Sequence, residues 1–235
     1  MNVFGDAVLF LNDPFNWTRP GNGILVLLVQ HLQISGAAVA LALVVALPLG
    51  IWLGHTGRGG AFTVALSNVG RAVPTLALLT LFAVTPIGFG PEATTLALAL
   101  FAVPPVLTNT YVGFRQVDRD VVEAARAMGM TGRQVTFRAE LPLAVPLVMT
   151  GVRTAAVQVV ATATLAALVA GGGLGRIINL GFGQQDYGQV VAGAIVVAAL
   201  AVLTEAVFVV LSWVLTPGPR TLPGFLRPRR RRAAA

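Results

Sequence analysis

The 235-residue sequence contains no cysteine, no lysine and only two histidines. Without cysteine the chain can form no disulfide, no cysteine-ligated metal site and no thiol nucleophile. His31 and His55 stand far apart at the ends of apolar segments, so they do not form a metal-ligand cluster. The absence of lysine excludes a Walker A phosphate loop, which needs a lysine after its glycines. We therefore expect no bound cofactor.

Charged residues are also scarce. They make up 11% of the sequence and hydrophobic residues 56%, whereas about 25% of the residues in a soluble domain are charged. A water-soluble globule cannot hide so much apolar surface. The apolar residues lie in long runs, and a helix needs about 20 of them in succession to cross the hydrocarbon core. The composition predicts an all-α integral membrane protein that has the lipid bilayer as its solvent.

Five apolar runs are long enough to span the membrane, so we expect about five transmembrane helices. A further apolar stretch, Ile24 to Leu32, is too short to cross alone. It either lengthens the first span or lies along the outer interface, and the sequence does not decide between these. The five predicted spans are Ser35 to Gly54, Ala61 to Ala83, Thr94 to Phe114, Ala144 to Ala170, and Gln189 to Leu215.

The net charge of +7 comes from arginines placed mostly between or beyond the apolar runs, which fits membrane topology better than nucleic-acid binding. Twelve arginines flank one side of the predicted bundle: Arg58, five in the segment after span three, and six in the C-terminal tail. The other side has only Arg19 and Arg176. The positive-inside rule predicts that the arginine-rich side is cytoplasmic, with the N-terminus outside and the C-terminus inside.

These spans divide the chain into an extracytoplasmic segment at 1–34, a transmembrane domain at 35–215 and a basic cytoplasmic tail at 216–235. Residues 1–16 carry two aspartates and no basic residue, unlike the start of a cleaved signal peptide. We therefore expect the first apolar segment to remain in the mature protein. The tail arginines are interpreted as a topological stop signal rather than a lipid-binding site.

The polar loop between spans three and four, at 115–143, predicts two short helices. Asp120 followed by Glu123 is typical of a capping box that starts the first helix, and Gly129 can take the left-handed conformation that ends it. Thr131 with Gln134 predicts a second capping box and a second helix. Pro142 and Pro146 then bracket the start of span four.

The same loop resembles the EAA motif of binding-protein-dependent ABC importer permeases. Glu123-Ala124-Ala125 is followed by three residues, Gly129, nine further residues and Ala139-Glu140-Leu141-Pro142. Ala139 departs from the isoleucine that is usual there. The resemblance implies that the first short helix docks into a cleft of a cytoplasmic ATPase subunit and transmits its closure to the pore. Small residues would allow close docking, and Glu123 would set the register. On a purely structural interpretation Glu123 caps the short helix and Gly129 ends it, and these roles are compatible with docking.

Other stretches, between about Ser35 and Leu215, resemble the permeases that import quaternary-ammonium osmoprotectants such as glycine betaine, carnitine or choline. Amino-acid and methionine importers share part of this pattern, so the substrate stays open between these classes. The stretches are Asn68 to Leu78, Asn109 to Tyr111, Met128 to Thr131, Gly151 to Ala155, Thr162 to Ala167 and Gly171 to Gly175. The glycine-rich Gly171 to Gly175 predicts a tight extracytoplasmic turn between spans four and five.

Polar residues inside the spans are candidates for the translocation pathway, because an intramembrane charge usually faces the protein interior. Two interpretations of Arg71 and Glu205 are open. The residues line or gate the pathway, or they form a buried pair or contact another subunit. Glu205 has no second carboxylate near it in the spans. Arg153 is expected to snorkel towards the cytoplasm, and a kink is expected at Pro104 and Pro105. The candidate pathway residues are Arg71, Asn109, Tyr111, Thr162, Thr164 and Glu205.

The resemblance implies a chain that performs no chemistry itself and lies in the bacterial cytoplasmic (inner) membrane. Its implied partners are ABC ATPase subunits, a second permease that is identical or homologous, and an extracytoplasmic substrate-binding protein. With only 7% aromatic residues and no aromatic cluster, we expect the cage for a quaternary ammonium in the binding protein. An ion-coupled transporter is a weaker alternative, since no inverted repeat or group of midplane carboxylates is evident. An integral-membrane enzyme lacks candidate catalytic groups.

Overall fold

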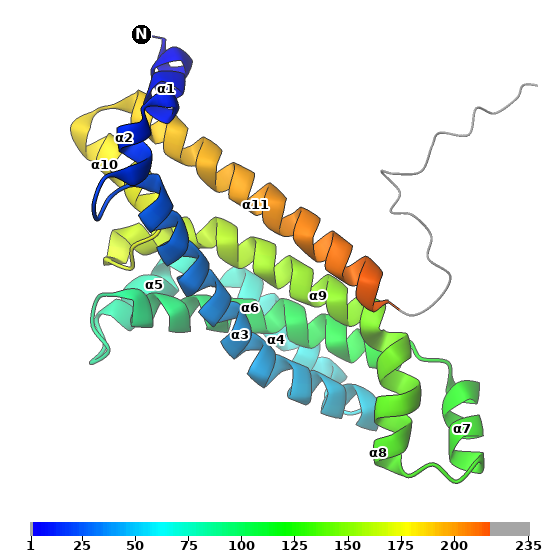
Figure 1. Ribbon diagram of the computed structural model, residues 1–235. Helices are drawn as coiled ribbons and strands as arrows, with labels where there is room; N and C mark the ends of the chain where they lie inside the picture. Colours follow the sequence, from blue (N-terminus) through cyan, green and yellow to red (C-terminus); the bar gives the residue numbers. More distant parts are fainter. Residues whose placement is uncertain (1, 217–235) are drawn as a thin grey trace, which may run out of the picture.

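The computed structural model describes residues 2–216, except for the side chain of Arg71. All regular elements in this part of the chain are helices, as predicted (Figure 1). Four of them are long and apolar enough to span a membrane: α3 at Ile24–Thr56, α6 at Pro91–Arg115, α9 at Leu141–Thr162 and α11 at Tyr187–Leu215. At about 1.5 Å rise per residue, each covers the roughly 30 Å of the hydrocarbon core. The predicted tail lies outside the described residues beyond Thr216.

The apolar stretch Ile24 to Leu32 belongs to the first span. α3 runs unbroken for 33 residues from Ile24 to Thr56, so of the two possibilities the structure supports a lengthened span. Before it, α1 at Val3–Asn12 and α2 at Pro14–Thr18 lie at the same end of the molecule as α10 at Gly175–Gln184 (Figure 1). α1 packs against α11.

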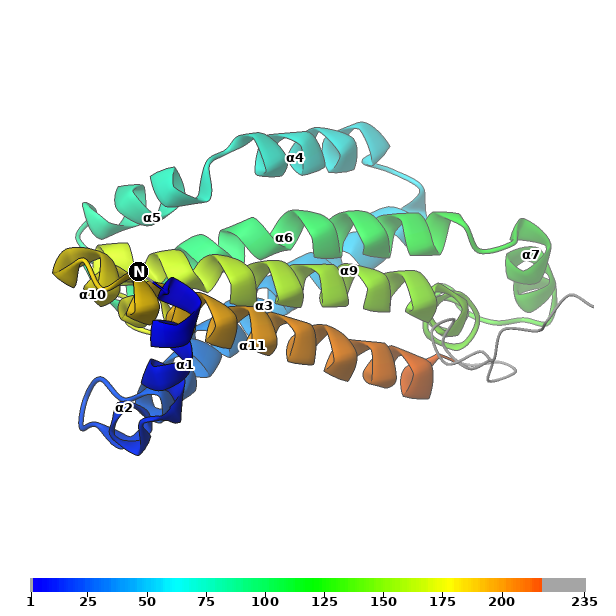
Figure 2. The same cartoon turned by 90° about the horizontal axis from the view of Figure 1, so that it is seen from above.

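The predicted second span is broken. α4 at Gly60–Ala72 and α5 at Thr75–Ala83 are bent by 84° at the break, so the pair forms either a broken fifth span or a re-entrant loop. Val73 between them has an extended backbone, at φ −77° and ψ 121°. The cause is Pro74, because a proline disfavours the helical conformation of the residue before it and supplies no N–H of its own. α4 and α5 lie along one side of the bundle, and α11 lies on the other (Figure 2).

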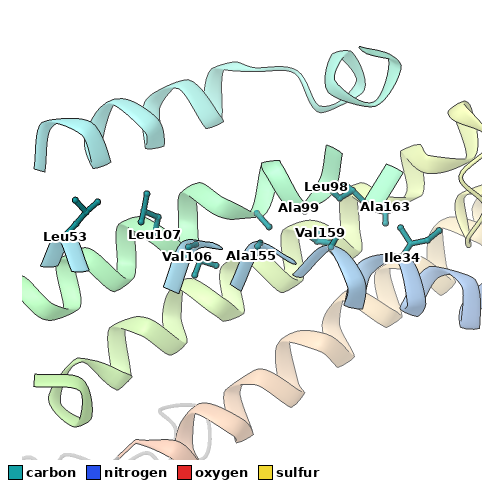
Figure 3. Packing of buried hydrophobic residues seen from close by; sticks show 13 residues of the cluster. Ile34, Leu53, Leu98, Ala99, Val106, Leu107, Ala155, Val159 and Ala163 are labelled. Atoms are coloured by element: carbon teal, nitrogen blue, oxygen red, sulfur yellow. The ribbon is translucent and has the colours of Figure 1, made fainter. Parts of the chain in front are cut away.

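The central core joins α3 to α6 and α9 (Figure 3). α3 carries small residues every fourth position, at Ala38, Ala42, Ala46, Gly50 and Gly54, which places them on one face. Such a stripe lets two helices approach closely in a membrane. A Cβ on Gly54 would lie 2.5 Å from the Phe114 Cβ of α6, so the close approach requires glycine there. From α6 and α9, the core takes Leu98, Ala99, Ala102, Val106, Leu107, Ala155 and Val159.

Spans four and five are joined by more than the predicted turn. A 3₁₀-helix, η2 at Ala163–Val169, extends α9, and the glycine-rich turn follows, with Gly172 and Gly173 at φ +82° and +79°. The chain then forms α10 before it enters α11. The predicted turn is therefore present between spans four and five, and it is followed by α10, a helix that the sequence analysis did not predict.

Candidate functional site

The short helix α7, at Arg119–Ala127, stands apart from the long helices at one end of the bundle (Figures 1 and 2). Its N-cap is Asp118, whose side chain accepts a hydrogen bond of 3.0 Å from the Asp120 backbone N–H. The predicted capping box of Asp120 and Glu123 is therefore wrong. An N-cap needs a non-helical backbone, which Asp118 has, whereas Asp120 already lies within the first turn.

The end of α7 is as predicted. Gly129 has a φ of +82°, its N–H donates to the Arg126 carbonyl at 2.9 Å, and the Met130 N–H donates to the Ala125 carbonyl at 3.2 Å. This pair of bonds is the Schellman arrangement, in which the residue after the helix is left-handed. The helix therefore ends abruptly, and the chain turns back towards the bundle.

α7 has an inner and an outer face. Val122 and Ala125 are buried, and they pack in a cluster with residues of α6, of the segment before α9 and of α9 itself. Glu123 and Ala124 are exposed, as is Met128, with 73% of its surface accessible. Of the residues that the resemblance assigns to docking, Glu123, Ala124 and Gly129 thus face outward and Ala125 faces the chain's own core.

The second short helix is not a separate element. α8 at Gly132–Gln134 has the predicted capping box, in which the Thr131 hydroxyl accepts from the Gln134 N–H at 3.4 Å and the Gln134 side chain accepts from the Thr131 N–H at 2.8 Å. It continues through a π-helical turn, η1 at Val135–Glu140, directly into α9. Pro142 therefore lies inside this continuous helix, just after the π-helical turn, instead of bracketing the start of span four. Half-buried Leu141 packs against the same cluster as α7.

The end of α3 is joined to this helix by a short hydrogen bond between two side chains, which the sequence analysis missed. His55 Nδ1 lies 2.5 Å from Glu140 Oε2 and 3.1 Å from the Thr136 hydroxyl. Because that hydroxyl donates to the Gly132 carbonyl, it can only accept from His55, so Nδ1 carries a proton. The Glu140 side chain is 2% exposed and that of His55 is 24% exposed. α3, the π-helical turn and α7 therefore meet at one end of the molecule.

A polar cavity of about 470 Å³ lies at membrane depth between α4, α6 and α9. Of the six predicted pathway residues, only Asn109 is among the described residues that line this cavity. Its lining residues are Ser67, Gly70, Phe101, Pro104, Pro105, Thr108, Asn109, Thr154 and Gln158. The side chain of Arg71, the residue after Gly70, lies outside the described part of the structure.

The other predicted pathway residues lie elsewhere. Half-buried Tyr111 has its hydroxyl against Gly60 at the start of α4. Thr162 ends α9, and Thr164 lies in η2 with its hydroxyl donating to the Ala161 carbonyl at 2.8 Å. The structure therefore does not bring the six residues together into one site.

Glu205 is not isolated. Its Oε1 lies 3.5 Å from Nε of Arg153, so the two charges join α11 to α9 within the same chain. The two side chains are 45% and 36% exposed, respectively. Of the two interpretations of Glu205, this contact favours a paired charge, with Arg153 of the same chain as its partner.

At the end opposite α7, the glycine-rich turn is fastened to α3. His31 is fully buried; its Nε2 donates to the Val160 carbonyl at 2.8 Å and its Nδ1 accepts from the Leu174 N–H at 3.3 Å. One ring nitrogen donates and the other accepts, so the imidazole is neutral. Beside this fastening is a second cavity, of about 410 Å³, whose lining residues are Gln30, Gln33, Ile34, Pro91, Thr95, Ala170, Gly171, Gly172 and Arg176.

Comparison with known proteins agrees with this arrangement. The family described as the inner membrane component of binding-protein-dependent transport systems matches residues 46–215. The glycine betaine/carnitine/choline transport system permease protein of Bacillus subtilis is 34% identical over 197 residues, which cover 84% of this chain and 90% of that protein. A carnitine transport permease protein of Listeria monocytogenes is 38% identical over the same shares of the two chains.

Solved structures show the same fold. A chain of the MetNI methionine ABC transporter in an inward-facing conformation matches with a TM-score of 0.71 at 21% identity, covering 83% of this chain and 96% of that one. At this identity the likeness concerns the fold alone. The family match extends over most of the chain and the relatives are similar over nearly their whole length. The chain therefore belongs to the family of inner membrane components of binding-protein-dependent transport systems, as an integral membrane permease.

Proposed function

We propose that this permease imports a quaternary-ammonium osmoprotectant, such as glycine betaine, carnitine or choline, and that α7 is its point of attachment to a separate ATPase subunit. The functions of the relatives that match over most of the chain support the solute class. The proposed complex also contains a second permease subunit and an extracytoplasmic binding protein. ATP hydrolysis would take place on the ATPase, and this chain would perform no chemistry.

The observation that carries the proposal is the shape of α7. Its outer face offers Ala124, with a minimal side chain, beside the exposed Met128 and the charge of Glu123. A small residue permits close approach of a partner, a flexible methionine adapts to an apolar pocket, and a carboxylate fixes the register of docking. The inner face is held by the buried Val122 and Ala125. A force applied to the outer face would therefore move the bundle and not only the loop.

Two connections lead from α7 into the spans. The first is the apolar cluster that includes Phe114 at the end of α6 and Ala144 and Val148 in α9. The second is the bond between His55 at the end of α3 and Glu140 before α9. We expect closure of the ATPase subunits to tilt these three helices together, which would switch the cavity from outward to inward access.

This arrangement requires α7 in the cytoplasm, the N-terminus outside and the C-terminus inside. The distribution of arginines supports that orientation, because Arg119, Arg126, Arg133 and Arg138 lie on or next to α7 and α8. At the other end, among the residues around the glycine-rich turn and α10, Arg176 is the basic residue that lines the 410 Å³ cavity.

The experiment is uptake of labelled glycine betaine, carnitine, choline and methionine by the complete transporter in proteoliposomes, with ATP hydrolysis measured in parallel. We expect ATP-dependent uptake of at least one of the three quaternary ammonium compounds and none of methionine. Glu123→Gln should lower the uptake per ATP hydrolysed or release the ATPase during purification. Glu92→Gln, an exposed carboxylate in the first turn of α6 at the opposite end, is the matched control and should behave as the unmodified protein. Uptake of methionine alone would overturn the solute class, and uptake without nucleotide would overturn the whole proposal.

A further inference from the structure

The cavity between α4, α6 and α9 has the composition of a binding site for a small molecule. Its volume of about 470 Å³ lies within the roughly 300–1,000 Å³ of small-molecule sites. Residues with hydroxyl or amide side chains line it from all three helices: Ser67 from α4, Thr108 and Asn109 from α6, and Thr154 and Gln158 from α9, of which the Thr154 hydroxyl donates to the Thr150 carbonyl at 2.8 Å. Side chains of this kind are costly to place at membrane depth unless they face a partner or a cavity.

Two consecutive prolines interrupt the hydrogen bonds of α6 where it borders this cavity. Pro104 and Pro105 have no N–H, so the carbonyl oxygens of Leu100 and Phe101 lose their usual helical donors. Phe101 is one of the lining residues. A carbonyl without its donor at membrane depth is tolerated where it faces protein or a water-filled space. The two prolines therefore leave the backbone carbonyl of one lining residue, Phe101, without its usual helical donor.

Two polar side chains of α6 complete this surface. The Asn109 amide nitrogen donates to the Pro105 carbonyl at 2.8 Å, which leaves its carbonyl oxygen and its second N–H to offer to a ligand. The Thr108 hydroxyl is buried without a hydrogen-bond partner in the described structure. A buried polar atom that lacks a partner needs an explanation, and rotation of the Thr108 side chain towards a ligand in the cavity would supply one.

None of the nine described lining residues is ionisable. These nine residues therefore offer no opposite charge to a net-charged solute that loses its hydration beside them. A zwitterion has no net charge, and its two ends can be met separately. The diffuse positive charge of a quaternary ammonium suits neutral oxygens and an aromatic face, whereas a carboxylate suits hydroxyl and amide donors such as Thr108 and Gln158.

We propose that this cavity is a transient binding site for a net-neutral quaternary-ammonium carboxylate, so that the permease itself favours glycine betaine or carnitine over the net cation choline. The inference rests on the proposed function and adds a second selection step to that of the binding protein. Low affinity is required of such a site, because a solute held tightly would not leave it. The absence of a full charge among the described lining residues is consistent with weak binding.

The test compares the uptake of betaine and choline by the complete transporter in proteoliposomes, at saturating binding protein. Asn109→Asp is nearly isosteric and places a carboxylate in the cavity. We expect it to raise the ratio of choline to betaine uptake on the order of tenfold. Thr108→Val and Gln158→Leu should each lower the maximal rate of betaine uptake, also on the order of tenfold, without changing the affinity of the isolated binding protein. Thr150→Val is the matched control, because this α9 hydroxyl donates to the Pro146 carbonyl of its own helix and does not line the cavity.

Several outcomes decide the matter. An unchanged choline-to-betaine ratio in Asn109→Asp, together with normal rates in Thr108→Val and Gln158→Leu, overturns the cavity site and leaves the proposed function standing. Loss of assembly with the second permease, in place of a slower rate, also overturns it and indicates that partner side chains fill the space. If the unmodified transporter carries none of the quaternary ammonium compounds, both proposals fail.

Discussion

Replacement of His55 by alanine should destabilise the permease more than replacement of its partner Glu140 by leucine, because the two changes leave different groups behind. His55→Ala leaves a carboxylate whose side chain is only 2% exposed. Removing one member of a buried ion pair costs about 3–5 kcal/mol. Glu140→Leu leaves an imidazole whose side chain is 24% exposed and which keeps the Thr136 hydroxyl as an acceptor. The stability lost in Glu140→Leu is therefore closer to the cost of one broken buried hydrogen bond, about 1–3 kcal/mol.

The difference between the two variants is therefore about 2 kcal/mol. For a chain of this size, 1 kcal/mol shifts the midpoint of thermal unfolding by about 2–4 °C, so His55→Ala should unfold roughly 4 to 8 °C below Glu140→Leu. Thermal unfolding of the detergent-purified protein, followed by loss of the monodisperse peak in size-exclusion chromatography, measures this difference.

The double variant His55→Ala/Glu140→Leu is the control for the reasoning. It removes both polar groups and leaves no buried charge, so we expect it to be more stable than His55→Ala alone. Equal midpoints for the two single variants, or a double variant that loses the sum of both effects, would refute the interpretation of His55 and Glu140 as a coupled buried pair.

Three further changes test other contacts. Gly129→Ala, at a φ of +82°, should weaken the end of α7 by about 1 kcal/mol and lower the uptake per ATP hydrolysed. Gly132→Ala is its control, because a Cβ added there lies within 4 Å of no other group and the backbone is not left-handed. It should have little effect in the same transport assay. Gly54→Val should force α3 away from α6 at a cost of about 1–3 kcal/mol, visible as a lower unfolding midpoint; an unchanged midpoint would contradict the close approach. For the pair Arg153 and Glu205, replacing both by leucine should be less harmful to stability than replacing either one, and additive losses in a double-mutant cycle would show that the two charges do not interact.

Much of the fold could be predicted from the sequence, because membrane spans are set by length and polarity. The ends of α6 and α11 lie within a few residues of the predicted spans. The break between α4 and α5 was missed, although Pro74 and its effect on Val73 were visible in the sequence. A hydrophobic run hides such a break, since both halves are equally apolar and composition alone does not show a change of direction.

The local structure of the loop was partly predictable. Gly129 and the box of Thr131 and Gln134 follow rules that depend on neighbouring residues only, and these predictions are confirmed. The N-cap was placed at Asp120 when Asp118 fills it. Two acidic residues stood close together, and the choice between them depends on where the preceding helix ends and on the burial of Val117, which the sequence does not show.

Contacts between distant parts of the chain could not be predicted. His55 and Glu140 are 85 residues apart, and Glu140 looked like one position within a motif. Arg153 and Glu205 were both noted as intramembrane charges, but nothing local indicated that they face each other. The cavity is formed by three helices together, so a search along the sequence identified only Asn109 among its lining residues as a candidate pathway residue.

The central claim is that α7 is a cytoplasmic handle for an ATPase, and a single introduced cysteine tests it most directly. The chain has no cysteine of its own, so Ala124→Cys on the outer face of α7 provides a unique label, with Gln184→Cys, exposed at the end of α10, as its counterpart at the other end. We predict that in intact cells a membrane-impermeant maleimide labels the cysteine at 184 and not that at 124. In inside-out vesicles, a bifunctional reagent should join the cysteine at 124 to the ATPase subunit. Labelling of position 124 from outside the cell, or no crosslink to an ATPase in the intact transporter, would contradict the account.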